Sequence, residues 1–202
     1  MRISRINHYH HSLLRPLLRA GDTVVDCTVG NGHDALFLAK AVGREGRFIG
    51  FDIQAEALAR TRSRLVGAGI EEERFSLIEG SHSDLGRHVP VGIGGAVYNL
   101  GYLPGGDRSV VTGRGTTLSS IAEALELLRP EGFVSATLYY GHDGGREEAD
   151  GVLEYVSALD HDRFKVAHLS YPNLPNDPPS LVMVQHTPRR VETAREGRTG
   201  EE

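Results

Sequence analysis

The sequence predicts an α/β domain built on a doubly wound, seven-stranded, mostly parallel sheet whose last strand is antiparallel. Three observations predict it. Short apolar runs rich in Val, Ile and Phe alternate with helix-like segments from the start of the chain. Glycine and polar residues follow the first strands directly, as at the ligand crevice of parallel sheets. A loop rich in Pro and Asn, not a helix, joins the last two apolar runs, which favours an antiparallel final strand.

Each element has its own signal in the sequence. Residues 6–20 carry leucines at helical spacing and predict a short N-terminal helix, which Pro16 starts or breaks. Continuous apolar runs predict buried strands, at residues 22–29, 47–53, 75–80, 95–101, 132–140, 163–171 and 179–186. Helical spacing predicts further helices, at residues 35–43, 56–69 and 117–132. The last of these is expected to end at Pro130-Glu131-Gly132.

Length and composition suggest one domain over residues 1–187, followed by a disordered tail at 188–202 that is rich in Arg, Glu, Gly and Thr. No apolar run approaches the roughly 20 residues of a membrane span, and no signal-peptide pattern is visible, so we expect a cytoplasmic protein. The single Cys27 cannot form a disulfide within the chain or a thiolate zinc cluster. No metal is expected. The net charge of −5 argues against a large nucleic-acid footprint.

The first strand runs into a turn that is typical of a nucleoside-cofactor site. Gly30 and Gly32 allow a ligand to approach the backbone closely. Asp34, near the start of the next helix, would repel a pyrophosphate but suits an ammonium group, such as that of the methionine part of S-adenosyl-L-methionine. Alternatively, Asp34 only caps the helix. Cys27 is interpreted as a small core residue beneath this site.

The next two strands also end in polar residues. Asp52, at the end of the second strand, can accept hydrogen bonds from both ribose hydroxyls. At the end of the third strand, Ser81 or His82 could bond the exocyclic nitrogen of an adenine. The alternative for His82 is a surface histidine with no role.

The fourth strand ends where a methyl donor would project. Asn99 and Tyr102 are spaced like the ends of an Asn-Pro-Pro-Tyr motif, with Leu100 and Gly101 in place of the prolines. In that motif a carbonyl accepts a hydrogen bond from the target nitrogen and an aromatic ring packs on the substrate. The alternative is a glycine-rich loop with a structural tyrosine.

The fifth strand ends in a cluster of aromatic, imidazole and carboxylate groups. Tyr140 could stack on a nucleobase, and His142 or Asp143 could accept the proton of a target amine. This proton matters because only the neutral amine attacks a methyl group. Two other polar segments are interpreted more plainly: the histidines at 8, 10 and 11 as surface residues, with substrate or dimer contact left open, and the loop at 173–180 as turn chemistry.

Four motifs, at 28–34, 51–54, 99–107 and 139–145, together resemble the YtqB/MnmM-type methyltransferases, a family also described as rRNA methylases. The resemblance covers roughly residues 1–187. It implies a Rossmann-like class I methyltransferase fold, S-adenosyl-L-methionine as cofactor, and a homodimer. It also implies methylation of the amine of 5-aminomethyl-2-thiouridine at the wobble position of tRNA, with the anticodon arm as partner.

The resemblance also distributes roles among the residues. The cofactor residues would be Gly30, Asn31, Gly32, Asp34, Asp52, Gln54, Ser81 and His82. The residues that face the substrate would be Asn99, Tyr102, Asp107, Tyr140, His142 and Asp143. The chain departs from the family pattern at Ser180, where a hydrophobic residue usually follows the Pro-Pro pair.

Four other functions stay open on the sequence alone. The acidic net charge would suit a methyltransferase of small-molecule amines, and an rRNA substrate is a further alternative. A non-catalytic module that binds the cofactor or a nucleotide would be expected to lack a polar motif after the fourth strand. An NAD-dependent dehydrogenase would share the strand-turn-helix and the acidic residue.

Overall fold

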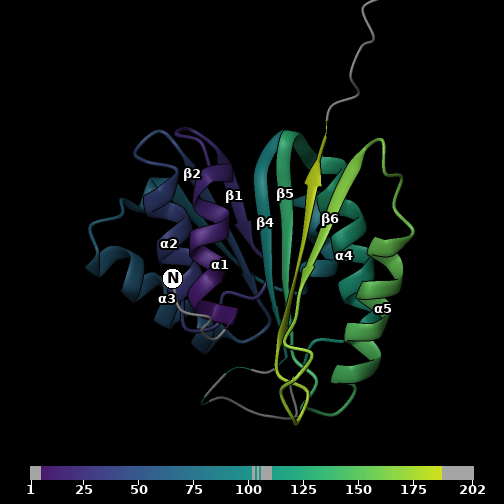
Figure 1. The fold of residues 1–202 in the computed structure, drawn as a ribbon. Helices are drawn as coiled ribbons and strands as arrows, with labels where there is room; N and C mark the ends of the chain where they lie inside the picture. Colours follow the sequence, from purple (N-terminus) through teal and green to yellow (C-terminus); the bar gives the residue numbers. More distant parts are fainter. Residues whose placement is uncertain (1–5, 102, 104, 106–110, 188–202) are drawn as a thin grey trace, which may run out of the picture.

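The computed structural model describes residues 6–101, 103, 105 and 111–187. Its centre is a seven-stranded sheet with the order β3-β2-β1-β4-β5-β7-β6. The first five strands are parallel to one another, and β7 pairs antiparallel with β5 and β6. Helices cover both faces (Figure 1). This is the Rossmann-like class I methyltransferase arrangement that the sequence predicts, antiparallel last strand included.

The elements follow the expected order. The strands are β1 (Thr23–Asp26), β2 (Arg47–Asp52), β3 (Phe75–Glu79), β4 (Ile93–Leu100), β5 (Leu128–Leu138), β6 (Phe164–Leu169) and β7 (Ser180–His186). The helices are α1 (Ile6–Leu14), α2 (His33–Ala41), α3 (Ala55–Gly67), α4 (Arg114–Leu127) and α5 (Gly145–Ser157), with 3-10 turns η1 (Arg15–Leu17), η2 (Glu72–Arg74) and η3 (His82–Arg87). Within these described residues, no helix is both long and apolar enough to cross a bilayer.

Two elements differ from expectation. Helix α4 ends at Leu127, earlier than predicted, because Leu128 already pairs with Ile93 in the sheet. Gly95 then pairs with Phe133, so the residues between Leu128 and Phe133 loop out of the ladder at the start of β5. The residues after the fifth strand were expected to form only a loop. In the structure, α5 starts at Gly145, directly after that loop.

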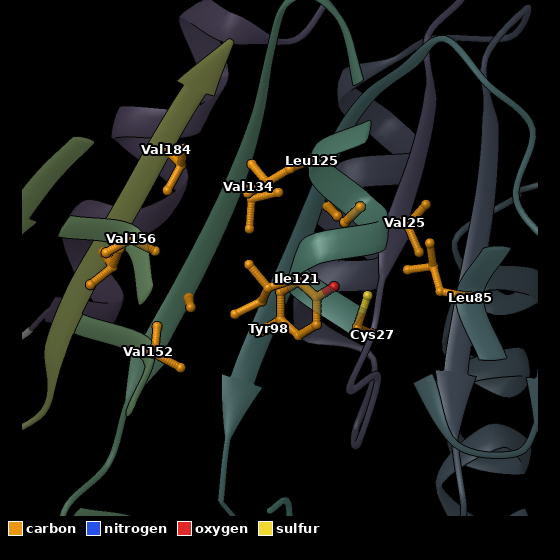
Figure 2. Packing of buried hydrophobic residues seen from close by; sticks show 14 of the residues in the cluster. Val25, Cys27, Leu85, Tyr98, Ile121, Leu125, Val134, Val152, Val156 and Val184 are labelled. Atoms are coloured by element: carbon orange, nitrogen blue, oxygen red, sulfur yellow. The ribbon is translucent and has the colours of Figure 1, made fainter. Parts of the chain in front are cut away.

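The core is split by the sheet into two layers. Helices α4 and α5 and the turn η3 cover one face, where the apolar cluster includes Tyr98, Ile121 and Val152 (Figure 2). The Tyr98 hydroxyl is buried and forms a hydrogen bond with Ser120 Oγ at 2.8 Å. Helices α2 and α3 cover the other face, and Leu14 of α1 belongs to that second cluster. Both faces of the central strands are therefore buried, which explains their continuous apolar runs.

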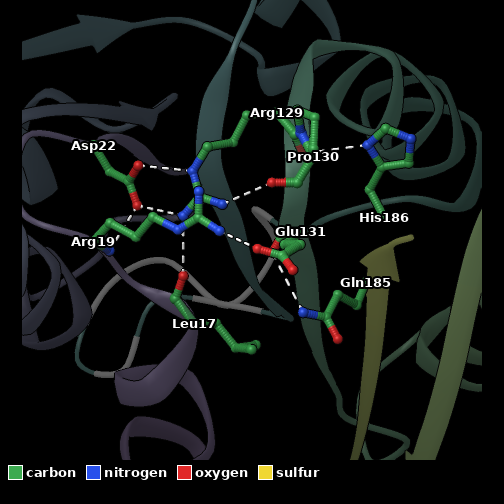
Figure 3. Close-up of polar contacts among 8 residues, drawn as sticks. All are labelled: Leu17, Arg19, Asp22, Arg129, Pro130, Glu131, Gln185 and His186. Atoms are coloured by element: carbon green, nitrogen blue, oxygen red, sulfur yellow. Dashed lines mark hydrogen bonds and ion pairs between the residues drawn. The ribbon is translucent and has the colours of Figure 1, made fainter. Parts of the chain in front are cut away.

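A polar network ties the elements together at the amino ends of the parallel strands (Figure 3). The Arg129 guanidinium donates two hydrogen bonds to the Asp22 carboxylate, Nε to Oδ1 at 2.8 Å and Nη2 to Oδ2 at 2.7 Å. It also donates to the Leu17 carbonyl at 3.1 Å, and the Arg129 carbonyl accepts from His186. These contacts join η1, β1, β5 and β7 at the end of the sheet that is opposite the strand tips with the predicted site residues.

Candidate functional site

A cavity of about 810 Å³ lies at the carboxyl ends of β1 to β5, a size typical of ligand pockets. Of the eight predicted cofactor residues, only Gly32 is not among its lining residues. Asn99 and His142 line it from the predicted substrate side. The cavity also contains side chains that the sequence analysis did not assign to it: His10 and His11 from α1 and Thr28 after β1.

The loop after β1 has the tight backbone that its glycines predicted. Gly30 and Gly32 have φ angles of 49° and 75°, in the left-handed region that favours glycine. A Cβ on Gly32 would lie 2.7 Å from Thr61 Oγ1, so this glycine also permits α3 to pack closely. Two arginines of α3 hold the residue between the glycines: Arg60 donates to Asn31 Oδ1 at 3.0 Å and Arg64 to its carbonyl at 2.8 Å. Gly32 thus shapes the loop without lining the cavity.

Asp52 sits at the end of β2 with its carboxylate at the cavity wall. Its two oxygens accept hydrogen bonds from the backbone N–H groups of Gly30 and Gln54, each at 3.0 Å. The carboxylate therefore fixes the distance between the first two strand ends. Because a carboxylate has about four lone-pair sites, both oxygens keep the capacity to accept ligand hydroxyls. Burial raises the pKa of Asp52, in spite of these hydrogen bonds.

Two carboxylates, Asp34 and Asp52, line this part of the cavity and favour a cationic ligand, and a third acidic residue, Asp26, is buried at the end of β1. Burial and the negative charge of Asp34 raise the pKa of Asp26 well above its usual value, and Asp52 adds to this effect. Asp26 is fully buried and accepts one hydrogen bond, from the Thr28 N–H at 3.0 Å. A pyrophosphate would be repelled here, whereas a ligand with sulfonium and ammonium groups would be attracted.

Asp34 has a different role from the helix cap considered in the sequence analysis. The N-cap of α2 is Gly32, and no side chain caps this helix. The Asp34 carboxylate instead binds His11 Nε2 through Oδ1 and Asn99 Nδ2 through Oδ2, both at 2.5 Å. Burial acts to raise the pKa of Asp34, but the His11 hydrogen bond, the charges of His10 and His11 and the Asn99 hydrogen bond lower it overall.

The expectation that the N-terminal histidines lie at the surface is wrong for His10. His10 is buried, with Nε2 at 2.9 Å from Ser135 Oγ of β5, and burial lowers its pKa. His11 is partly exposed and stacks on Phe37 of α2 with 3.9 Å between ring centroids. The sequence showed the imidazoles but not that α1 docks over the strand ends.

His10, His11 and Asp34 also form a cluster of possible metal ligands. The geometry favours a hydrogen bond over a shared ion, because His11 Nε2 and Asp34 Oδ1 are 2.5 Å apart. Two ligands of one tetrahedral zinc ion lie about 3.3 Å from each other, given bond lengths near 2.0 Å. A metal would require this pair to separate.

Asn99, at the end of β4, is held in one orientation. Its backbone N–H donates to Thr28 Oγ1 at 2.7 Å, and its side-chain Nδ2 donates to Asp34. A carboxylate is only an acceptor, so the nitrogen of the amide must face Asp34 and the carbonyl oxygen must face away from it. This is the arrangement that a carbonyl acceptor for a target amine requires.

The end of β3 contributes a hydroxyl and a neutral imidazole. Ser81 Oγ accepts from the Ser83 N–H at 3.2 Å, and both Ser81 and His82 line the cavity. His82 is not a surface histidine: it is buried, and burial lowers its pKa to about 4. Within the described part of the chain, its Nδ1 has no hydrogen-bond partner. A buried ring nitrogen of this kind calls for a partner, which a ligand could supply.

The fifth strand brings only part of its predicted cluster to the cavity. His142 lines it, with Nε2 4.0 Å from Glu148 Oε2 of α5. Glu148 is buried and accepts hydrogen bonds from Thr112 and Thr117, so it anchors this loop to the start of α4. Sequence analysis missed Glu148, because it lies in the helix that was not anticipated.

Two predicted substrate residues are placed outside the cavity. Asp143 is exposed and lines a separate depression between α4 and α5. Tyr140 packs against the core, and its hydroxyl forms a hydrogen bond with Ser180 Oγ at 2.7 Å, so the departure at Ser180 has a structural use. Tyr102 and Asp107 lie outside the described residues, as does the tail predicted at 188–202.

Comparison with known proteins yields one family and several relatives. A family model described as "Putative rRNA methylase" matches residues 48–185. The "tRNA (mnm(5)s(2)U34)-methyltransferase, chloroplastic" of Arabidopsis thaliana is 40% identical over 159 residues, which are 74% of this chain and 58% of the plant protein. The chain therefore spans little more than half the length of that relative.

Solved structures agree with the fold. A Clostridium thermocellum protein described as a "putative rRNA-methylase" has a TM-score of 0.88 at 37% identity, over 92% of this chain and 100% of its own. A Streptococcus mutans protein described as a "putative methyltransferase", in complex with SAH, has a TM-score of 0.82 at 35% identity, over 92% of this chain and 99% of its own.

Proposed function

Because the chain belongs to the "Putative rRNA methylase" family of S-adenosylmethionine-dependent class I methyltransferases, we propose that it methylates an amine on tRNA. The proposed target is the aminomethyl group of 5-aminomethyl-2-thiouridine at the wobble position, and the product is the methylaminomethyl form. The 40% identical plant relative, named for that modified uridine, supports this substrate class.

The observation that carries the proposal is the fixed amide of Asn99. Asp34 and Thr28 hold this residue so that its carbonyl oxygen faces away from Asp34. An amine has N–H groups to donate to such an oxygen, whereas an ionised phenol or carboxylate acceptor would have none. The site therefore suits a nitrogen nucleophile.

The cofactor residues follow from the cavity. Asp52 would accept the ribose hydroxyls, Ser81 and His82 would face the adenine, and Asn31 with Gln54 would line the space between them. S-adenosylmethionine supplies an electrophilic methyl group when it is bound. The Asp34 carboxylate, whose pKa is lowered overall, lines the cavity and suits its positive charge. Asp34 was predicted to bind the cofactor, but here we assign it to the part of the site that binds the methyl acceptor. The reason is that both of its oxygens are engaged by His11 and Asn99.

The test is methyl transfer to tRNA whose wobble uridine carries the free aminomethyl group, isolated from cells that lack this enzyme. We expect labelled methyl to enter that tRNA, with nucleoside mass spectrometry showing one added methyl on the wobble base. The 16S rRNA and small-molecule amines serve as alternative acceptors in the same assay. Transfer to either of these, with none to tRNA, would disprove the substrate assignment.

A variant of Asn99 tests the chemistry. Asn99→Ala should lower the rate of methyl transfer by about 100-fold, as is typical for the loss of an oriented polar group in a reaction centre. The affinity for S-adenosylmethionine should change by less than about threefold. An equal loss of rate and of cofactor affinity would instead place Asn99 among the cofactor contacts.

A further inference from the structure

We propose that His11 is the residue that takes the proton from the target ammonium, with Asp34 as its positioning residue. This inference rests on the proposed function, since it concerns the amine that is methylated. His11 comes from α1, which lies outside the residues that the family model matches. The first helix thus completes a reaction centre whose other parts come from the start of α2 (Asp34) and the end of β4 (Asn99).

The proton must be removed before transfer can occur. An alkylammonium has a pKa of about 10, so near neutral pH nearly all of the substrate carries a proton on the nucleophile. Only the neutral nitrogen has a lone pair for the methyl carbon. An acceptor within the cavity, close to Asn99, is therefore required for a useful rate.

One carboxylate links the proposed proton acceptor to the residue that would bind the amine. Asp34 Oδ1 lies 2.5 Å from His11 Nε2, and Oδ2 lies 2.5 Å from Asn99 Nδ2. Because the carboxylate accepts, the His11 proton sits on Nε2, and Nδ1 is left with a lone pair. A carboxylate behind a histidine fixes its tautomer and stabilises the imidazolium that forms.

The surroundings of His11 fit this role. Its ring is fixed by stacking on Phe37, with 4° between the ring planes. Its side chain is 37% exposed, which gives the received proton a route to water. The other ionisable groups around the pair are His10 on α1 and Asp26 at the end of β1. His10 stays neutral near neutral pH because burial lowers its pKa, so it does not oppose a positive charge on His11.

The two proton acceptors predicted from the sequence, His142 and Asp143, are less suitably placed for this role than His11. Asp143 lies in the separate depression between α4 and α5. His142 lines the cavity, and its Nε2 lies 4.0 Å from Glu148 Oε2 of α5. His11, in contrast, binds Asp34 directly, and Asp34 in turn binds Asn99.

In the proposed step, proton transfer precedes methyl transfer. The N–H bond of the substrate ammonium breaks, and its proton passes to His11 Nδ1, which makes an imidazolium. The nitrogen lone pair then forms a bond to the methyl carbon while the carbon–sulfur bond breaks, and that electron pair stays on sulfur. The product is a protonated secondary amine, and His11 releases one proton to water.

The experiment compares His11→Gln with the wild type in single-turnover methyl transfer to aminomethyl-bearing tRNA, from about pH 7 to about pH 10. Glutamine keeps an N–H donor for Asp34 but cannot take up a proton. We expect a loss of about 100-fold near pH 7. The loss should shrink to within about threefold near pH 10, where the amine loses its proton unaided. Cofactor affinity by calorimetry should stay within about threefold.

The matched control is His161→Gln, because His161 is 87% exposed and lies on the turn before β6, away from the cavity. It should behave as wild type at every pH. His11→Ala provides a second variant, and added imidazole should restore part of its rate near pH 7.

The outcomes separate the two claims. If the wild type methylates this tRNA and His11→Gln matches it near pH 7, the inference is wrong and the proposed function stands. An equal deficit at all pH values, or a loss of cofactor affinity, would also overturn it. If the wild type transfers nothing to this tRNA, the proposed function fails and the inference falls with it.

Discussion

Asp52 shows how a single residue can serve both the fold of a site and its ligand. It accepts backbone hydrogen bonds from Gly30 and Gln54, and we propose that it also accepts the ribose hydroxyls. Asp52→Ala should therefore weaken cofactor binding by about 100-fold, because hydrogen bonds to a charged group contribute about 1.5–3 kcal/mol each. Isothermal titration with S-adenosylmethionine or SAH measures this loss.

The matched control for Asp52 is its register partner at the next strand end, Glu79, which is exposed. Glu79→Ala should bind the cofactor like the wild type. Both variants should retain the circular-dichroism spectrum of the wild type, since the strands themselves are buried on both faces. Unchanged affinity in Asp52→Ala would remove this residue from the cofactor site.

Asp26 is a residue whose charge should make stability depend on pH. Its folded-state pKa is raised by burial and by Asp34, so the folded state binds more protons than the unfolded state above about pH 3.9. The free energy of unfolding must then fall as pH rises through the window between the ordinary and the raised pKa. Asp26→Asn removes this titration.

Urea unfolding of the wild type and Asp26→Asn at several pH values from about 5 to 8 tests this expectation. The wild type should lose more unfolding free energy over that range than Asp26→Asn does, because only the wild type has this titrating group. Burying the amide of Asp26→Asn can also change the free energy of unfolding, but this change is the same at every pH and cancels when the two ends of the pH range are compared. Parallel pH profiles would contradict the raised pKa.

At the scale of elements, the contact between Arg129 and Asp22 fixes β5 to β1 at the end of the sheet away from the cavity (Figure 3). Both side chains are largely buried, at 13% and 8% exposure. Arg129→Leu leaves the Asp22 carboxylate without this partner, which should lower the free energy of unfolding by about 3 kcal/mol. Chemical denaturation measures the change.

The same variant separates stability from function. Arg129→Leu should bind SAH with wild-type affinity at temperatures where it is folded, because the network and the cavity lie at opposite ends of the strands. Arg129→Lys serves as a comparison: it keeps the charge but not the two-pronged geometry, and it should lose less stability. A weakened SAH affinity in Arg129→Leu would show that the two ends are coupled.

The elements also show what the sequence could predict. The positions of the strands and of the polar residues at their ends could be predicted from the sequence. Buried parallel strands are continuous apolar runs, and their carboxyl ends meet at one edge of the sheet. The docking of α1 could not be predicted from the sequence, since it depends on contacts between distant segments, such as that of His10 with Ser135. The roles of His10 and His11 could therefore not be derived from their spacing. Glu148 was missed because helix α5, in which it lies, was not anticipated.

For the whole molecule, the fold followed from local patterns because doubly wound sheets leave few alternatives once strands and helices alternate. The net charge was a poorer predictor of the ligand than the local patterns were of the fold. The value of −5 averages over the whole chain, whereas the lining of the cavity combines two carboxylates with five imidazoles. The homodimer remains a prediction, which light scattering during size-exclusion chromatography can test.

Ligand-induced stabilisation distinguishes the cofactor classes in the intact protein. A ligand at about 100 times its Kd adds about 2.7 kcal/mol to the free energy of unfolding, and for a chain of this size that raises Tm by about 5–10 °C. SAH should produce this shift, because its adenosine can bond Asp52 and the end of β3 without placing phosphate near Asp34. NADH should produce none, since its pyrophosphate would face the negative charge of Asp34 beside the loop after β1. Asp52→Ala provides the control, as the SAH shift should nearly vanish in it. A shift with NADH and none with SAH would reverse the assignment of this cavity.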